Sequence, residues 1–162
     1  MREEQFEHLY TEHAQGLLAF LVYRTGDHAL AEDLLADTFE RVLRARRHFD
    51  PRKASEKTWL YTIALNLLRD HARRVAAADR ARERVTATNR TVGTGGALAA
   101  VEDRDAVQRA LHALSPEERE AVALRYGGDL TIPEIARLRG EKLTAVEGRV
   151  YRALRKLKAE LM

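Results

Sequence analysis

The sequence predicts an all-α protein made of two small helical domains joined by a flexible linker. Apolar residues recur at three- and four-residue intervals through residues 1–75. The pattern then fades into small residues, threonine and glycine over residues 76–103, and helix start signals return within residues 104–162. A chain of 162 residues divided in this way gives each domain only a modest core, which excludes a large enzyme.

The first domain is expected to contain three helices. Apolar residues in helical register occupy residues 6–22, and a glycine and an aspartate then interrupt the pattern. A second amphipathic stretch covers residues 28–47 and ends before Pro51, whose ring disfavours helix at the preceding residue. A third helix begins near residue 59 and is strongly basic by residue 74. The good helix formers that follow leave open an extension to about residue 85.

The second domain carries clear helix start signals. Ser115 and Pro116 combine an N-cap serine with proline at the first helical position, and Glu118 completes a capping box. A second capping box at residues 131–134 opens a short helix that stops at Gly140, and a longer basic helix follows. A short helix, a glycine-containing turn and a longer basic helix are typical of a helix-turn-helix, whose second helix enters the major groove of DNA.

The charge of the chain alternates along its length. Residues 1–40 carry two basic against nine acidic residues, a net charge of −7, and residues 41–90 carry fourteen against five, a net charge of +9. Residues 91–130 carry four against seven, and residues 131–162 carry eight against four. Two separated basic blocks indicate two contacts with a polyanion. The acidic blocks indicate either solvated faces or a surface for a basic protein partner.

Several features narrow the class of protein. The chain has no cysteine, which excludes disulfides, thiolate zinc sites and cysteine nucleophiles. No apolar run approaches the roughly 18 residues of a membrane span. The N-terminus lacks the apolar core of a signal peptide, so we expect a cytoplasmic protein without membrane insertion. The histidines show no HExxH spacing and no glycine-rich phosphate loop is present, so no catalytic residue, metal site or cofactor is predicted; the histidines are His8, His13, His28, His48, His71 and His112.

Three stretches carry a family resemblance when they are taken together. Residues 27–39 form an acidic amphipathic stretch, residues 59–74 run from Trp-Leu-Tyr to an Arg-Arg pair, and residues 114–153 run from Leu-Ser-Pro-Glu-Glu-Arg through Gly140 to Arg-Ala. In this order, with a linker between the second and the third, they resemble the sigma-70 superfamily of RNA polymerase sigma factors. Within it, the chain resembles the extracytoplasmic-function (ECF) group over nearly its full length.

The resemblance implies both a fold and a division of labour. Residues 1–75 resemble sigma region 2, a bundle of three or four helices that binds the beta-prime clamp helices of core RNA polymerase and recognises and melts the minus-10 element of promoter DNA. Residues 104–162 resemble sigma region 4, a helix-turn-helix that reads the minus-35 element and meets the beta flap. Catalysis then belongs to the polymerase. Members of the group are commonly held inactive by an anti-sigma factor, which is a further partner that the resemblance implies.

An acidic ridge is expected on the second helix of the first domain. Glu32, Asp33 and Asp37 lie beside its apolar stripe, and such a ridge suits a basic partner surface. The resemblance places polymerase binding at Glu32, Asp33, Asp37 and Glu40. A solvated acidic face without a partner is the alternative interpretation.

The third helix combines aromatic with basic residues. A protein that holds unstacked bases needs aromatic planes and a cationic groove, and promoter opening requires that chemistry. The residues expected at the minus-10 element are Lys57, Trp59, Tyr61, Asn66, Arg69, Arg73 and Arg74. For Trp59, a place in the core of the domain is the alternative interpretation.

The last helix carries residues for two kinds of DNA contact. Arg152 can offer two donors to a guanine edge, and Glu147 can accept from a cytosine amino group. Arg149 and Arg155 are expected at phosphates. The residues expected at the minus-35 element are Thr144, Glu147, Gly148, Arg149, Tyr151, Arg152 and Arg155.

The start of this last helix departs from the family pattern. Thr144 and Glu147 have the spacing of a capping box, so the helix is expected to begin later than is usual in the family. This departure leaves the exact minus-35 preference open. Val146, Val150 and Leu154 are expected to face the core of the domain.

One alternative function remains open from the sequence. A plain helix-turn-helix regulator would bind DNA independently of polymerase and use residues 1–75 as a sensor or dimerisation domain. That function requires a ligand pocket or a self-complementary surface in the first domain. An enzyme is a weaker alternative, because no catalytic constellation emerges from the sequence.

Overall fold

The computed structural model describes residues 1–85 and 101–162, and every regular element within these ranges is helical. This confirms the predicted all-α fold. Residues 86–100, which fall inside the predicted linker, lie outside the described residues. The elements are α1 (Glu3–Thr25), α2 (His28–Ala45), η1 (Arg46–His48), α3 (Glu56–Val85), α4 (Val101–His112), α5 (Pro116–Val122), η2 (Ala123–Gly127), α6 (Ile132–Arg139) and α7 (Leu143–Leu161).

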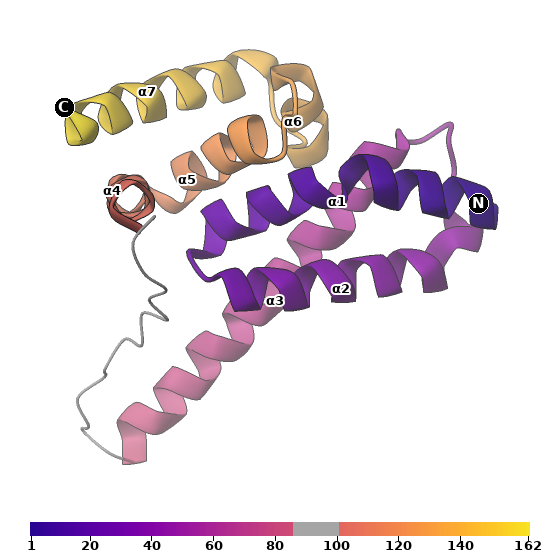
Figure 1. Ribbon diagram of the computed structural model, residues 1–162, viewed down its shortest axis with the longest axis horizontal. Helices are drawn as coiled ribbons and strands as arrows, with labels where there is room; N and C mark the ends of the chain where they lie inside the picture. Colours follow the sequence, from indigo (N-terminus) through magenta and orange to yellow (C-terminus); the bar gives the residue numbers. More distant parts are fainter. Residues whose placement is uncertain (86–100) are drawn as a thin grey trace.

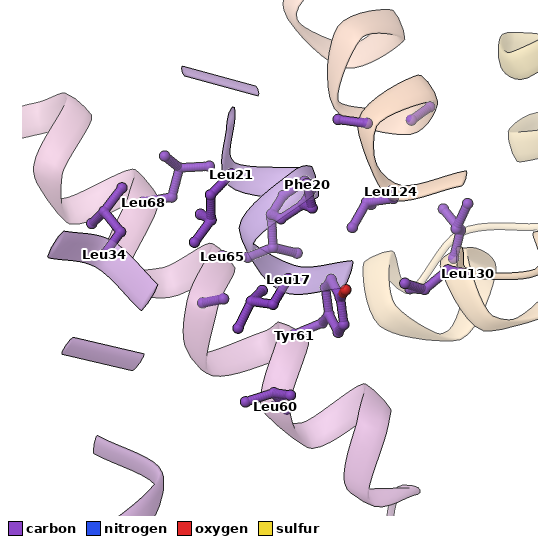
Figure 2. Packing of buried hydrophobic residues seen from close by; sticks show 14 of the residues in the cluster. Leu17, Phe20, Leu21, Leu34, Leu60, Tyr61, Leu65, Leu68, Leu124 and Leu130 are labelled. Carbon is purple, nitrogen blue, oxygen red and sulfur yellow. The ribbon is translucent and has the colours of Figure 1, made fainter. Parts of the chain in front are cut away.

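The N-terminal domain consists of α1, α2 and α3. Helices α1 and α2 lie side by side and antiparallel, and α3 crosses them (Figure 1). The turn between α1 and α2 is determined by its own two residues, Gly26 and Asp27. Gly26 ends α1 in the left-handed conformation, with φ of 72°, and Asp27 caps α2 by accepting a 3.1 Å bond from the Leu30 amide. The domain core is a cluster of leucines and aromatic residues that includes Leu17, Leu21, Leu34, Leu65 and Leu68 (Figure 2).

Helix α3 is longer than its share of the core requires. Its last buried residue is Leu68, and the side chains described after it are exposed or half-buried. The helix continues to Val85, the extension that the sequence left open. In Figure 1 the C-terminal end of α3 extends beyond the other helices. The first ten residues of the predicted linker, 76–85, are therefore helical.

The C-terminal domain consists of α4 to α7. Both predicted capping boxes are present. The Ser115 hydroxyl accepts from the Glu118 amide at 3.2 Å while the Glu118 carboxylate accepts from the Ser115 amide at 3.0 Å, and Thr131 and Glu134 repeat the pattern at α6. Gly140 ends α6 with φ of 64°, and α7 follows after two residues. Helices α6 and α7 thus form the predicted helix-turn-helix.

The two domains pack against each other. The π-helical turn η2 lies on α1, and α6 contacts α3. Phe20 and Tyr61 of the N-terminal domain belong to the same apolar cluster as Leu124 and Leu130 of the C-terminal domain (Figure 2). A second, smaller cluster lies wholly inside the C-terminal domain and is built on Leu111, Leu114, Val122 and Ala153. The large apolar cluster therefore continues from the N-terminal domain into the C-terminal domain.

Candidate nucleic-acid and partner interfaces

The predicted acidic ridge lies on the outer face of α2. Glu32, Asp33, Asp37 and Glu40 are all exposed. Two of them have partners on the same helix, because Glu32 lies 3.2 Å from His28 and Glu40 lies 2.6 Å from Arg44. Asp33 and Asp37 have no ion-pair partner within the described ranges. The face therefore presents two unpaired carboxylates one helical turn apart.

A polar stripe runs along the exposed side of α3. Asn66, Arg69 and Arg73 are exposed and follow one another at three- and four-residue spacing, and Arg74 lies beside them. Arg73 lies 3.5 Å from Asp70 at the surface, a contact that leaves the guanidinium largely exposed. Four of the predicted minus-10 residues thus share one accessible face.

The other three predicted minus-10 residues are less exposed. Trp59 is half-buried against the domain core, and its ring lies 4.9 Å from that of Phe49. The Lys57 ammonium donates to the Asp129 carbonyl at 3.1 Å and lies 3.6 Å from Glu134. Lys57 is therefore engaged with the C-terminal domain.

Tyr61 differs most from its predicted place at the surface. Its side chain is 1% exposed, packs on the ring of Phe20 at 5.7 Å, and donates a 3.4 Å bond to the Gly128 carbonyl. Burial raises the pKa of the Tyr61 phenol well above its ordinary value, and the charges of Glu134 and Asp129 add to the effect. In this conformation Tyr61 is a core residue between the domains and does not face solvent.

The exposed face of α7 carries the remaining predicted DNA contacts. Thr144, Glu147, Tyr151, Arg152 and Arg155 are exposed, and Gly148 is half-buried between them. The guanidinium of Arg155 lies over the Tyr151 ring, 6.0 Å from its centroid. Six predicted minus-35 residues are thus brought together on one helix face.

The start of α7 corrects one prediction. Lys142 has an extended backbone and is the N-cap, and the helix begins at Leu143, so Thr144 already lies inside the first turn. The amides of Ala145 and Val146 bond to the Lys142 carbonyl, so the expected capping box at Thr144 does not form. The helix consequently does not begin late. On its inner face Ala153 is buried, and Leu154, which was expected to face the core, is 38% exposed.

Arg149 is the predicted phosphate contact that the structure places elsewhere. Its guanidinium donates two bonds to the Glu141 carboxylate, at 3.1 and 2.5 Å, and Glu141 also accepts from Arg139 at 2.6 Å. Arg139 in turn pairs with Glu120 on α5. The hydrogen bonds from Arg149 and then Arg139 lower the pKa of Glu141 to about 2. This network joins α5, α6 and α7, and Arg149 is part of it.

The sequence alone did not point to this network or to the contact between the domains. The carboxylates of Glu120 and Glu141 have no motif around them, and their partners are identified only once the helices are packed. The Gly127-Gly128 pair is a local feature of the contact between the domains. A Cβ atom on Gly127 would lie 3.0 Å from the Phe20 backbone, and one on Gly128 would lie 2.8 Å from the Tyr61 hydroxyl.

Two further properties concern the described residues only. No cluster of three or more histidine, aspartate or glutamate side chains in the described ranges is arranged to hold a metal ion. Among the helices of those same ranges, each is too short or too polar to cross a membrane.

Comparison with known proteins places both domains in one family. Residues 9–78 match Sigma-70 region 2, and residues 104–157 match Sigma-70, region 4. The chain is 36% identical to the RNA polymerase sigma factor CarQ of Myxococcus xanthus over 96% of this chain and 88% of CarQ. It is 32% identical to the ECF RNA polymerase sigma factor BldN of Streptomyces coelicolor over 95% of this chain and 59% of BldN. The chain belongs to the ECF group of the sigma-70 family. Membership favours the sigma-factor interpretation over a plain helix-turn-helix regulator.

Solved structures share the fold of this sigma factor. The sigma factor RpoE of Bartonella quintana, solved in complex with the anti-sigma factor NepR, aligns with a TM-score of 0.77 at 24% identity, over 98% of this chain and 97% of that one. CnrH, solved in complex with the cytosolic domain of CnrY, aligns with a TM-score of 0.70 at 28% identity, over 99% and 89%. The alignments extend over both helical domains.

Proposed function

We propose that this sigma factor binds core RNA polymerase and directs promoter-specific initiation of transcription through minus-10 and minus-35 elements. The observation that carries the proposal is that the two family-matched domains each present an exposed face of the required chemistry. The acidic face of α2 suits a basic protein surface, and the faces of α3 and α7 suit DNA. Catalysis belongs to the polymerase in this proposal, and the chain itself needs no cofactor.

Polymerase docking is assigned to the acidic face of α2. The carboxylates of Asp33 and Asp37 are exposed and have no ion-pair partner within the described ranges. A basic partner protein therefore does not have to displace a cationic side chain of this chain to reach them. Glu32 and Glu40 are drawn to neighbours on the same helix by contacts that solvent weakens. The beta-prime clamp helices are the proposed partner of this face, and the beta flap is the proposed partner of the C-terminal domain.

The minus-10 contacts are assigned first to the stripe on α3. Asn66, Arg69, Arg73 and Arg74 form a continuous polar and cationic track along one side of the helix. Trp59, at the start of the same helix, supplies a half-exposed aromatic face. Lys57 and Tyr61, the other two predicted minus-10 residues, both contact the C-terminal domain.

The minus-35 contacts are assigned to the outer face of α7. Arg152 is the proposed reader of a guanine edge and Glu147 of a cytosine amino group, with Thr144, Gly148 and Tyr151 beside them. Arg155 is the proposed phosphate contact. For Arg149 we propose a different role, in which its bond to Glu141 sets the orientation of α7 in the groove.

An anti-sigma factor is a further proposed partner. RpoE of Bartonella quintana was solved in complex with the anti-sigma factor NepR, which makes a protein inhibitor a reasonable expectation for this sigma factor as well. Action on RNA polymerase would take place in the cytoplasm.

Reversal of Asp33 and Asp37 to lysine tests the docking face and the function together. Asp33→Lys/Asp37→Lys should weaken binding to purified core polymerase and abolish run-off transcription, because like charges then face the basic partner. The free energy of unfolding should change by less than about 1 kcal/mol, because both side chains are exposed.

The matched control reverses two exposed carboxylates at the same spacing on α1, Glu3→Lys/Glu7→Lys, and should bind polymerase like wild type. Normal polymerase binding by the folded Asp33/Asp37 variant would remove the docking face. Tight, sequence-specific binding of duplex DNA by the free protein, with no transcript when polymerase is added, would instead favour the regulator.

A further inference from the structure

Gly148 lies in the second turn of α7, on the face that the proposed function gives to the minus-35 element. Glycine in the interior of a helix is less favourable than alanine, because a residue without a Cβ atom loses more conformational freedom on folding. The helix is therefore less stable than it would be with alanine at this position. Three features can explain such a glycine: the local backbone, the packing around it, or the ligand that this face binds.

Neither the backbone nor the packing of the domain requires this glycine. Among the glycines of the described ranges, positive φ angles occur at Gly26 and Gly140, so the backbone at Gly148 is ordinary helix. Apart from the adjoining residues and the backbone of its own helix, a Cβ atom at Gly148 would have only the Arg152 guanidinium within 4 Å. The core of the domain therefore leaves room for a side chain here, and the explanation that remains is the ligand.

The guanidinium group of Arg152 lies over the backbone of Gly148. Side chains on a helix point back toward its N-terminus, so a residue covers the turn that precedes its own Cα atom. Because position 148 has no side chain, the Nη1 atom of Arg152 comes within 3.2 Å of the place where a Cβ atom would stand. The same direction carries the guanidinium toward the N-terminal turns of α7, the part of a recognition helix that contacts base edges.

The three arginines of α7 differ in what holds them. Arg149 donates two bonds to Glu141, and Arg155 lies over a tyrosine ring, 6.0 Å from its centroid. Arg152 has neither a hydrogen-bond partner nor an ion-pair partner within the residues that the structure describes. The direction of its guanidinium is therefore set by the turn of helix beneath it, and the residue there is Gly148.

We propose that Gly148 is a positioning residue for minus-35 recognition, because its missing side chain lets the Arg152 guanidinium lie against α7 and present two donors to one guanine edge. This proposal rests on the proposed function, which assigns a guanine to Arg152. A guanine offers its N7 and O6 atoms as acceptors in the major groove, and a planar guanidinium meets both only in one orientation. A side chain at position 148 lifts the guanidinium away from the helix and breaks that two-donor contact.

Gly148→Ala separates this role from a structural one. Its Cβ atom meets only the far end of a flexible side chain, so the fold is kept and Tm should rise, by about 2–4 °C for a chain of this size. Run-off transcription by the holoenzyme, from promoters with every base pair at each minus-35 position, measures base preference. Wild type should prefer guanine at one position by about tenfold or more, and Gly148→Ala should lose most of that preference.

A double variant tests whether Gly148 acts through Arg152. Arg152→Ala should lose preference at the same position as Gly148→Ala, and Gly148→Ala/Arg152→Ala should have the preference of Arg152→Ala alone, because the two changes remove one contact. A promoter with 7-deazaguanine at that position lacks the N7 acceptor. It should reduce transcription by wild type about fivefold or more and leave transcription by Gly148→Ala nearly unchanged.

Gly16→Ala is the matched control, because it makes the same replacement inside α1. Its Cβ atom would lie 3.5 Å from the Gly128 carbonyl oxygen, an ordinary contact distance. This variant should also raise Tm, and it should keep the base preference of wild type.

Four results would overturn the proposal: a Gly148→Ala variant that keeps the guanine preference of wild type, one with a lower Tm, an Arg152→Ala variant with unchanged preference, and a double variant whose loss is the sum of the two single losses. The proposed function fails by a separate result, which is the absence of any run-off transcript from the wild-type protein with core polymerase.

Discussion

The two domains are stabilised in different ways. In the N-terminal domain the helices are joined by apolar side chains, and ion pairs such as Arg73–Asp70 and Arg44–Glu40 lie within single exposed helices. In the C-terminal domain several ion pairs connect different helices. Lys156 on α7 bonds to Glu118 on α5 at 2.8 Å, and Glu141 links α7 to the end of α6. Pairs within an exposed helix contribute little to stability, whereas bridging, half-buried pairs fix one helix against another.

The difference follows from the amount of apolar surface each domain has. The N-terminal helices bury a large apolar cluster. The cluster that lies wholly inside the C-terminal domain contains four buried residues. The other buried apolar residues in the C-terminal part of the large cluster pack with the N-terminal domain. A small core cannot orient a long helix by itself. The position of α7, the helix proposed to read DNA, thus depends on ionised carboxylates more than that of α3 does.

The largest expected effect lies in the apolar domain. Leu65, which is 2% exposed, packs in the centre of the N-terminal core (Figure 2), and Leu65→Ala should lower the free energy of unfolding by about 2–5 kcal/mol. Urea unfolding followed by circular dichroism measures the loss. Because the cost comes from a cavity, it should be the same at low and high salt. A marked salt dependence would show that the apolar account of this domain is incomplete.

A smaller and electrostatic effect is expected in the C-terminal domain. Glu141→Gln should lower the free energy of unfolding at neutral pH by about 1–3 kcal/mol, because the guanidinium groups of Arg139 and Arg149 lose their charged acceptor. Added salt should reduce the loss. Glu147→Gln, which changes an exposed glutamate on α7, is the control and should change stability by less than about 0.5 kcal/mol.

The same carboxylate gives the effect a defined pH dependence. The pKa of Glu141 falls from an ordinary value of 4.5 to about 2 in the folded protein, so its ionised form stabilises the fold above pH 4.5. That contribution is lost as the pH falls from 4.5 through about 2. Wild type and Glu141→Gln should therefore converge in stability over this acidic range, and parallel melting curves down to pH 2 would contradict the role given to Glu141.

The smallest expected effect separates two arginines on α7. Arg152→Ala should remove preference at one or two minus-35 positions, by about tenfold in binding or about 1.4 kcal/mol. Arg155→Ala should weaken all promoters alike and reduce the salt dependence of binding, as loss of a phosphate contact does. Transcription from a library of minus-35 sequences distinguishes the two. An Arg152→Ala variant that lowers every promoter equally would reassign this residue to the phosphate backbone.

The sequence predicted what depends on local chemistry. The capping boxes at Ser115 and Thr131 and the stop at Gly140 were identified correctly, because each depends on residues within three or four positions of one another. The same rule failed at Thr144. A capping spacing is present there, but Lys142 already supplies the extended residue that starts the helix.

Contacts between distant segments were beyond the reach of the sequence. Tyr61 lies 67 positions before Gly128, and its aromatic and basic surroundings on α3 are equally suited to DNA binding and to packing. The basic helix predicts a phosphate contact for Arg149, but the turn after α6 brings Glu141 beside it. The polymerase contacts of α2 and the DNA contacts of α7 stay predictions, and the structure shows that the residues proposed for them are mostly exposed.

The turn η2 makes the contact between the domains sensitive to chain length. Its closing bond runs from the Gly128 amide to the Ala123 carbonyl, five residues apart, where an α-helical turn would close over four. In evolutionary terms, such a turn equals a one-residue insertion into a helix. Deleting one residue from 123–127 would rotate the following residues by about 100° around the helix axis and carry Gly128 away from Tyr61. A relative that is one residue shorter at this place would keep both domains but lose the contact between Gly128 and Tyr61.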